Sequence, residues 1–195
     1  MDKIYFAHPT SMYSTPIESV LIRLIARELA DGDLNLIENP NQPYHQVGYN
    51  QYAKRVRESG TNHKGMSYFY AEVLPGCTGG CVGAPFLDGR LGLGVAGEMK
   101  WSLERGRPVW TVVPSNKLLH NGTQVFVRDI PGVFFSVRPI TDEEAKLVLS
   151  EDPKLVVPHQ ETRLRSWMVY DRIIRPYELA HLVTMPIPDG FYLEG

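Results

Sequence analysis

Within the stretch 85–114, PFLDGRLGLGVAGEMKWSLERGRPVWTVVP, residues 88–98 bring two carboxylates, a guanidinium and several glycines together. Its candidate site residues are Asp88, Arg90, Gly92, Gly94 and Glu98. The pattern places Glu98 where a helix begins, and a carboxylate in the first turn of a helix is held ionised by the helix dipole and by free backbone N–H groups. An ionised carboxylate suits a nucleophile better than a proton donor. Glu98 is therefore the predicted nucleophile, and the alternative is that it only favours the start of the helix.

The elements that must position these residues form one parallel crossover. Residues 85–87 end a strand, a glycine-punctuated loop follows, an amphipathic helix begins near Glu98, and 108–114 form a second strand. Open α/β sheets bind ligands beyond the carboxyl ends of their strands, which is where this loop lies. The glycines either form a turn that needs unusual backbone angles or let a substrate approach the backbone. We favour the second interpretation, that the glycines let a substrate approach the backbone, because Asp88 and Arg90 share the same loop.

The segment from Gly92 to Gly97 also satisfies the GxGxxG fingerprint of dinucleotide-binding proteins, between a strand and a helix as that motif requires. In that motif the next strand ends in an acidic residue that holds a ribose, whereas here it ends in Val113-Pro114-Ser115. The hypothesis of a nicotinamide-dependent oxidoreductase therefore rests on the glycine pattern alone. The chain contains no GxxxxGK[ST] motif, so a P-loop is not indicated, and it contains neither GxSxG nor HExxH.

Strands and helices alternate along the chain as far as residue 114. Apolar periodicity and capping residues predict strands at 3–7, 34–37, 80–87 and 108–114, and helices that start at Thr15, at Met66 and near Glu98. The polar stretch 41–64 is predicted to hold at most one helix, near 49–58, and to be a lid or an insertion. The small residues of 80–87 indicate that another element packs closely on that strand. The alternation predicts an α/β fold with a flavodoxin- or Rossmann-like doubly wound parallel sheet.

After residue 114 the pattern changes. It predicts strand-like segments at 124–128 and 133–137, a capped helix from Thr141, a strand at 155–157 and a helix at 161–174. We expect a main α/β domain over residues 1–137 and a C-terminal α+β extension over 138–195. The extension is expected to pack on the same domain or on a neighbouring subunit.

Small polar residues follow the first strand. His8 ends that strand and is expected to face the site, and Thr15-Pro16-Ile17-Glu18 has the form of a capping box with proline at the first helical position. Ser11, Ser14 and Thr15 offer hydroxyls and N–H groups at the start of a helix, where an anion such as a phosphate is stabilised. We expect these residues to bind substrate, and the alternative for Thr15 is a simple helix cap.

Composition restricts the partners and cofactors. The formal net charge is −2 and no 18-residue apolar run occurs, so neither polymeric nucleic acid nor a membrane is an expected partner. The opening is too short for a signal peptide, and we expect a cytoplasmic protein. Cys77 and Cys81 have no second Cys or His cluster at ligand spacing, so no metal and no disulfide framework is expected, and no cofactor is implied.

Three segments together resemble the nucleoside 2-deoxyribosyltransferase family, which includes nucleotide N-glycosidases that release a free base. These segments are Ile4-Tyr5-Phe6, Glu72 before the central strand, and Glu98 to Pro114 with Gly106 eight residues after the glutamate. The likeness covers residues 3 to 114. It implies a homo-oligomeric enzyme that cleaves the C1′–N bond of a small-molecule nucleoside or nucleotide through Glu98.

The resemblance also implies a role for several side chains. Glu98 attacks C1′ as oxocarbenium character develops there, and Tyr5 orients Glu98 by a hydrogen bond. Glu72 contacts a sugar hydroxyl or the base. Asp88 is our candidate for protonating the leaving base, with a pKa raised by desolvation. Arg90 is assigned to a phosphate or to a base carbonyl, because its planar fork suits bidentate contacts.

The chain departs from the family at two carboxylates. Gly80 stands where the family often has an aspartate, and Gly92, six residues before Glu98, replaces another carboxylate. These departures motivate the alternative of a non-catalytic nucleotide-binding module that senses its ligand. The polar residues before the first helix favour a nucleoside monophosphate, whereas the base, the sugar and the choice between hydrolysis and transfer stay open.

Overall fold

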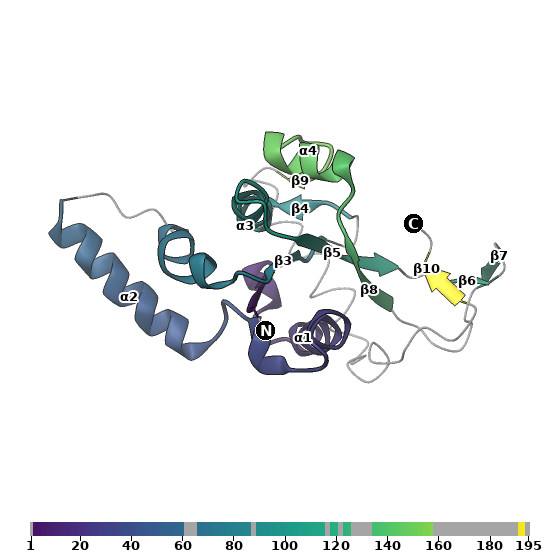
Figure 1. The fold of residues 1–195 in the computed structure, drawn as a ribbon, viewed down its shortest axis with the longest axis horizontal. Helices are drawn as coiled ribbons and strands as arrows, with labels where there is room; N and C mark the ends of the chain where they lie inside the picture. Colours follow the sequence, from purple (N-terminus) through teal and green to yellow (C-terminus); the bar gives the residue numbers. More distant parts are fainter. Residues whose placement is uncertain are drawn as a thin grey trace.

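A mixed five-stranded sheet forms the centre of the molecule (Figure 1). The computed structural model describes residues 2–60, 66–86, 89–115, 118–120, 123–125, 134–157 and 191–193. Across the sheet the strands are β2 (Ile37–Glu38), β1 (Ile4–Ala7), β3 (Gly80–Gly83), β5 (Val109–Ser115) and β8 (Phe134–Pro139). The first four run parallel, and β8 is antiparallel to β5. The predicted α/β class is confirmed, and the sheet is mostly parallel with one antiparallel strand at this edge.

No helical crossover occurs among the described residues that connect β5 to the antiparallel edge strand β8. A parallel neighbour needs a connection of a dozen or more residues that usually forms a helix. The described residues between β5 and β8 instead form two short antiparallel strands, β6 (Leu118–His120) and β7 (Thr123–Val125). The strand β10 (Phe191–Leu193) pairs with β6, so these three strands form a second small sheet.

Helices cover both faces of the main sheet (Figure 1). Helix α1 (Pro16–Leu29) lies on one face, and helices α3 (Leu93–Leu103) and α4 (Asp142–Ser150) lie on the other. Because side chains alternate along a strand, β1 sends Phe6 to the α1 side and Tyr5 to the α3 side. Both rings are fully buried. The alternation therefore carries Tyr5 towards the helix that contains Glu98.

The predicted start of α1 is confirmed, but one half of its capping box is absent. The Oγ1 atom of Thr15 accepts a hydrogen bond from the Glu18 backbone N–H at 3.4 Å, and a proline is the first helical residue. In a full box the Glu18 carboxylate would bond back to the backbone of Thr15. It accepts instead from the backbone N–H of Ser14 at 2.6 Å. The end of α1 is as predicted, since Asp31 and Gly32 follow it with positive φ angles of 49° and 85°.

The polar stretch after β2 forms a longer helix than its composition predicts. Helix α2 (Pro43–Glu58) begins well before the expected 49–58, because Pro43 supplies a favourable first helical position. Figure 1 shows α2 standing away from the sheet. Its inward face buries His45 and Ala53, with Tyr52 packed against the same core.

Short helical turns replace parts of the predicted elements. Residues 34–36 form the 3₁₀ turn η2 (Leu34–Leu36), and another 3₁₀ turn, η1 (Thr10–Met12), follows β1. Where the sequence predicts a helix over 66–74, the chain forms the π-helix η3 (Phe69–Val73) and the 3₁₀ turn η4 (Leu74–Gly76). π-Helices are rare and occur frequently at functional sites.

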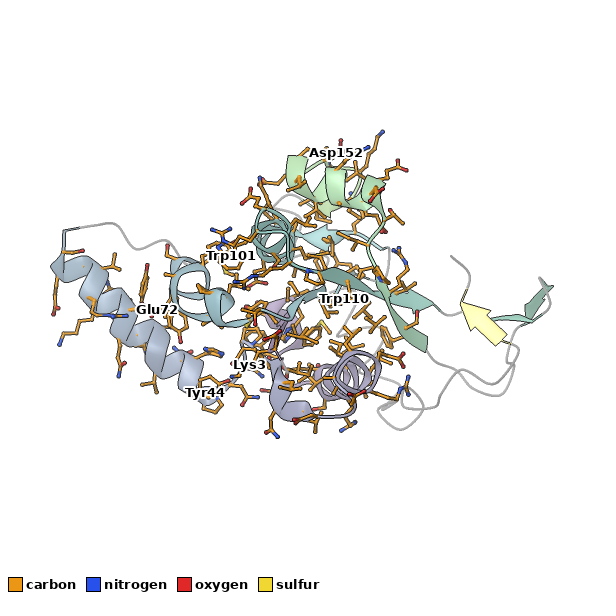
Figure 2. The ribbon with its side chains drawn as sticks, viewed as in Figure 1. Lys3, Tyr44, Glu72, Trp101, Trp110 and Asp152 are labelled. Carbon is orange, nitrogen blue, oxygen red and sulfur yellow. The ribbon has the colours of Figure 1, made fainter. Side chains whose placement is uncertain are left out.

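A buried carboxylate fastens α2 to the sheet. The Oε1 atom of Glu38 accepts from His45 Nε2 at 2.8 Å and from the Tyr44 hydroxyl, and its Oε2 accepts from Lys3 Nζ. The hydrogen bond from His45, opposed by burial and reinforced by Lys3, lowers the pKa of Glu38 to about 2. Figure 2 shows Lys3 and Tyr44 where α2 meets the body of the protein. An ionised Glu38 therefore holds the first turn of α2 in place.

The strand of small residues is shorter than predicted, and other elements cover it closely, as its composition predicts. A Cβ at Gly83 would lie 2.2 Å from the Sδ atom of Met99 in α3. A Cβ at Gly80 would lie 2.2 Å from the carbonyl oxygen of Pro108, and Gly80 has a φ of 116°. Glycines therefore let α3 and the approach to β5 lie directly on β3.

Residues 138–150 continue the main sheet and one of its helical layers. Strand β8 spans the predicted boundary between 137 and 138. Thr141 caps α4 in a full capping box with Glu144, as predicted. Val148 of α4 is fully buried in the same core as α3. The predicted helix at 161–174 lies outside the described residues.

Candidate functional site

Helix α3 begins earlier than its sequence predicts. Strand β4 (Leu91–Gly92) pairs in parallel with β9 (Val156–Val157), and Gly92 is the N-cap of α3 in an extended conformation. Glu98 therefore lies in the second turn, and the prediction of a first-turn carboxylate is wrong. The reason is tertiary, since pairing with β9 ends the loop at Gly92. The unpaired N–H groups belong to the first turn, so they do not stabilise an anion at position 98.

The side chain of Glu98 on α3 is buried, and it contacts Tyr5 of β1. Its exposed fraction is 5%, and the Tyr5 hydroxyl donates a hydrogen bond to its Oε1 atom at 2.7 Å. The predicted hydrogen bond between Tyr5 and Glu98 is therefore confirmed. Strand alternation directs Tyr5 to this face, and the packing of α3 on the same face brings together two residues that are 93 positions apart.

Burial gives Glu98 an unusual protonation state. It raises the pKa of Glu98 to about 8, although the hydrogen bond from Tyr5 acts in the opposite direction. In the described part of the chain no cation offsets this burial. The neutral acid therefore predominates at pH 7, and the prediction of a carboxylate held ionised is wrong for the ligand-free protein. Such a group donates a proton at neutral pH, or acts as a nucleophile after losing its proton.

Two further tyrosines lie near Glu98, and the sequence pattern singles out neither of them. Tyr13 follows η1 and Tyr70 belongs to η3, and both are half-buried. Burial and then the charge of Glu98 raise the pKa of Tyr13, and they raise that of Tyr70 to about 12. Among the described residues neither hydroxyl has a hydrogen-bond partner. The one sequence signal for Tyr70 is Gly97, whose missing side chain leaves room for the phenol.

The glycines around Glu98 differ in conformation. Only Gly89 has a positive φ among them, at 80°, so an unusual backbone does not explain Gly92 or Gly94. Gly94 is exposed, and a Cβ at this position would have no atom within 4 Å. It lies one turn before Glu98, and helical side chains lean towards the preceding turn. Gly94 therefore leaves the backbone of α3 accessible beside Glu98.

The residues predicted to bind an anion at the start of α1 surround a carboxylate of the protein itself. Glu18 accepts hydrogen bonds from His8 Nε2 at 3.1 Å, Ser14 N–H at 2.6 Å, Asn39 Nδ2 at 3.0 Å and Asn41 Nδ2 at 3.0 Å. Although burial acts the other way, the bonds from His8, Asn39 and Ser14 lower the pKa of Glu18. An ionised carboxylate therefore occupies the place that the sequence assigns to a phosphate.

The predicted ligand-binding atoms of this segment are engaged inside the protein. The Nδ1 atom of His8 lies 2.9 Å from the Phe6 carbonyl oxygen, and its ring stacks on the Phe6 ring with centroids 4.3 Å apart. The Oγ1 atom of Thr15 donates to the Met12 carbonyl oxygen at 2.6 Å. A phosphate at this position would have to displace these bonds as well as Glu18.

The other predicted residues lie on other elements or outside the described residues. Glu72 is exposed on η3 and accepts a hydrogen bond from Arg55 of α2 at 2.9 Å, and Figure 2 shows it beside that helix. Arg90 is half-buried directly before β4. Asp88 lies outside the described residues, as does the side chain of Ser11. The structure thus places Tyr5 in contact with Glu98, as predicted, whereas Glu72, predicted to contact the substrate, forms an ion pair with Arg55 of α2.

No protein-family model, curated protein or solved structure matches the chain. Within the described ranges, no three or more His, Cys, Asp or Glu side chains are grouped so that they could hold a metal ion. No helix in that same part of the chain combines the length and apolarity needed to cross a membrane. The function therefore has to be argued from the geometry around Glu98.

Proposed function

We propose that the protein cleaves the C1′–N bond of a nucleoside or nucleotide, as an N-glycosidase or deoxyribosyltransferase with Glu98 as its nucleophile. The observation that carries the proposal is the buried Glu98 carboxyl held by the Tyr5 hydroxyl at 2.7 Å. Glycosyl transfer through a covalent intermediate needs a carboxylate that is fixed in position and shielded from bulk water. The likeness to nucleoside 2-deoxyribosyltransferases at these two residues supports the same assignment.

The topology supports a ligand near this pair. The strand order β2, β1, β3, β5 suits a flavodoxin- or Rossmann-like doubly wound sheet. In such a sheet the order in which successive strands are added reverses, here between the parallel strands β1 and β3. Ligands of such sheets bind beyond the carboxyl ends of the strands at that point. Tyr13 follows β1 in this region, and Gly94 leaves the adjacent backbone of α3 accessible.

The proposed reaction has two displacements. Glu98 loses its proton, and a carboxylate oxygen forms a bond to C1′ as the C1′–N bond breaks. The bonding electron pair leaves with the base, which takes up a proton from an acid, and Asp88 remains our candidate for that acid. Water or a second base then attacks C1′ and releases the Glu98 carboxylate. Two inversions give net retention at C1′.

The direct test is release of free base from a panel of ribonucleosides, deoxyribonucleosides and their 5′-monophosphates, followed by chromatography. We expect the wild-type protein to release base and Glu98→Gln to be slower by at least about a thousandfold, because the amide cannot act as the nucleophile. The matched control is Glu104→Gln, an exposed glutamate at the other end of α3. Base release that Glu98→Gln leaves undiminished, or no release from any substrate, would rule the proposal out.

The second candidate is a nucleotide-binding module that senses its ligand without turning it over. The observation that favours it is the neutral state of Glu98 near pH 7, because a neutral carboxyl donates a hydrogen bond to a base or sugar. Calorimetry with the same panel separates the two functions. Binding that Glu98→Ala weakens, without any product from the wild-type protein, would favour the sensor over the enzyme.

A further inference from the structure

One oxygen of the Glu98 carboxyl lacks a partner in the described part of the chain. Tyr5 donates to Oε1, and no described group donates to Oε2. An ionised carboxylate away from water is stabilised chiefly by hydrogen-bond donors, and carboxylates with two or three donors ionise readily. Glu98 has only one, so a second donor at Oε2 would favour its ionised form.

Among the described residues, two half-buried phenols are influenced electrostatically by Glu98 and could donate to this oxygen. The Tyr13 ring packs on the His8 ring with centroids 5.1 Å apart, and both Glu98 and Glu18 act on its hydroxyl electrostatically. The Tyr13 hydroxyl is therefore influenced by two carboxylates. For Tyr70, Glu98 is the first electrostatic partner and no bond from a described residue competes.

Tyr70 is held against the helix that carries Glu98. Its hydroxyl oxygen lies 2.6 Å from the position that a Cβ at Gly97 would take, so only a glycine at 97 leaves room for it. The preceding residue, Phe69, packs edge-on against Tyr5 with ring centroids 6.4 Å apart. The π-helix η3 therefore contacts Tyr5 through the ring of Phe69. It contacts α3 at Gly97, the residue before Glu98, through the hydroxyl of Tyr70.

We propose that Tyr70 is a positioning residue, whose hydroxyl donates to the free oxygen of the Glu98 carboxylate once that group has lost its proton to solvent. Gly97 has no side chain because the phenol lies against the backbone there. Tyr70 keeps its own proton throughout, since burial and the Glu98 charge raise its pKa to about 12. The consequence for catalysis rests on the proposed function, whereas the effect on the titration of Glu98 does not.

The first test titrates Glu98 without any substrate, by ¹³C NMR of the glutamate side-chain carboxyls, with the Glu98 signal assigned by its loss in Glu98→Gln. We expect Tyr70→Phe to raise the pKa of Glu98 by about one pH unit, the size expected for the loss of one hydrogen bond to a charged group. Gly97→Ala should shift it in the same direction, because the added methyl displaces the hydroxyl. The matched controls are Tyr49→Phe on α2 and Gly76→Ala, where a Cβ would meet no atom within 4 Å.

The decisive comparison is between the two phenols. An unchanged or lowered Glu98 pKa in Tyr70→Phe overturns the inference, as does a rise in Tyr13→Phe that Tyr70→Phe lacks. Tyr70→Phe removes a single oxygen atom, so this result does not depend on whether Gly97→Ala folds.

The second test is the pH profile of base release, which separates this inference from the proposed function. In Tyr70→Phe the acidic limb of kcat/KM should move to higher pH by the same amount as in the titration, with KM little changed. A shifted titration in a protein that releases no base supports the role of Tyr70 and contradicts the glycosidase. Base release with an unshifted profile and an unshifted titration contradicts the role of Tyr70 alone.

Discussion

Glu98 combines a buried carboxyl with an exposed glycine nearby on the same helix. It is buried, with a pKa raised to about 8, and it lies one turn from an exposed glycine. A structural carboxylate in a core is usually paired with a cation or with several donors, as Glu18 and Glu38 are here. Within the described ranges, Glu98 has Tyr5 alone as a hydrogen-bond donor to its carboxyl. At the residue scale this contrast supports the proposal that Glu98 serves in chemistry rather than in stability.

If Glu98 is the nucleophile, activity rises with pH. Only the ionised carboxylate attacks C1′, so with a pKa of about 8 the value of kcat/KM should increase about tenfold per pH unit at acidic and neutral pH. It should level off above the pKa. The measurement is a profile of base release across this range, with stability checked at each pH. A profile that falls through this region would make Glu98 a proton donor and contradict its role as nucleophile.

Glu98 should also destabilise the fold as pH rises. Its folded-state pKa of about 8 exceeds its ordinary value of 4.5, so the unfolded chain releases this proton first and the free energy of unfolding falls between these two values. The loss is about 1.4 kcal/mol per pH unit. We expect Glu98→Gln to equal the wild type near the lower value and to exceed it by about 3 kcal/mol at neutral pH. Urea unfolding of both proteins at the two pH values measures this, and equal stability at neutral pH would contradict the raised pKa.

At the scale of elements, the start of α1 argues against a phosphate on the substrate. The N–H of Ser14 binds the ionised carboxylate of Glu18, and that carboxylate also takes the donors of Asn39 and Asn41. A second anion near this helix end would meet a like charge and few free donors. We expect kcat/KM for a nucleoside to exceed that for its 5′-monophosphate by at least about tenfold, the effect of 1.4 kcal/mol. Faster release of base from the monophosphate would show that Glu18 lies away from the sugar's 5′ end.

The strand β3 requires glycine where the resembled family often has an aspartate. Gly80 has a φ of 116°, and a Cβ there would lie 2.2 Å from the Pro108 carbonyl oxygen. We therefore expect Gly80→Ala to lower the free energy of unfolding by about 2 kcal/mol or more, through strain and overpacking. The control is Gly76→Ala, whose methyl enters open space and whose effect should stay within about 0.5 kcal/mol. Equal urea midpoints for the two variants would contradict the close packing of β3.

At the scale of the whole molecule, the described residues 138–157 belong to the same folded unit as the site. Val148 is fully buried in the core that also contains Tyr5 and Met99. Strand β9 pairs with β4, which immediately precedes α3. The C-terminal segment therefore contributes to the position of Glu98 through the start of its helix.

This continuity predicts one cooperative transition. Val148→Ala should lower the free energy of unfolding by about 2 kcal/mol, because it leaves a cavity in the shared core. The neighbouring Leu149 is 40% exposed, so Leu149→Ala should change stability by less than about 0.5 kcal/mol. Urea unfolding followed by circular dichroism and by tryptophan fluorescence should give coincident curves. A shift that circular dichroism detects and fluorescence does not would indicate that α4 unfolds separately.

The sequence by itself determined the features that depend on neighbouring residues. The alternating direction of the side chains along β1 placed Tyr5 on one face of the sheet. Thr15 and Thr141 marked the starts of two helices. The small residues of β3 indicated a closely packed strand, and the contact between Tyr5 and Glu98 followed from a resemblance in the same segments. The strand alternation, the helix caps and the small residues depend on backbone preferences or spacing within a few positions, which the order of residues contains directly. The contact between Tyr5 and Glu98 joins residues 93 positions apart, so it came from the resemblance and not from local spacing.

Only the tertiary structure decided what depends on contacts between distant segments. Because β4 pairs with β9, α3 begins at Leu93 and not near Glu98 as the sequence predicts. Glu98 therefore lies in the second turn of the helix. Burial from all sides then made Glu98 a neutral acid near pH 7 rather than the ionised group that its helix position predicts. The pKa of a side chain reflects the solvent, charges and donors around it in space, and no local pattern of residues specifies these.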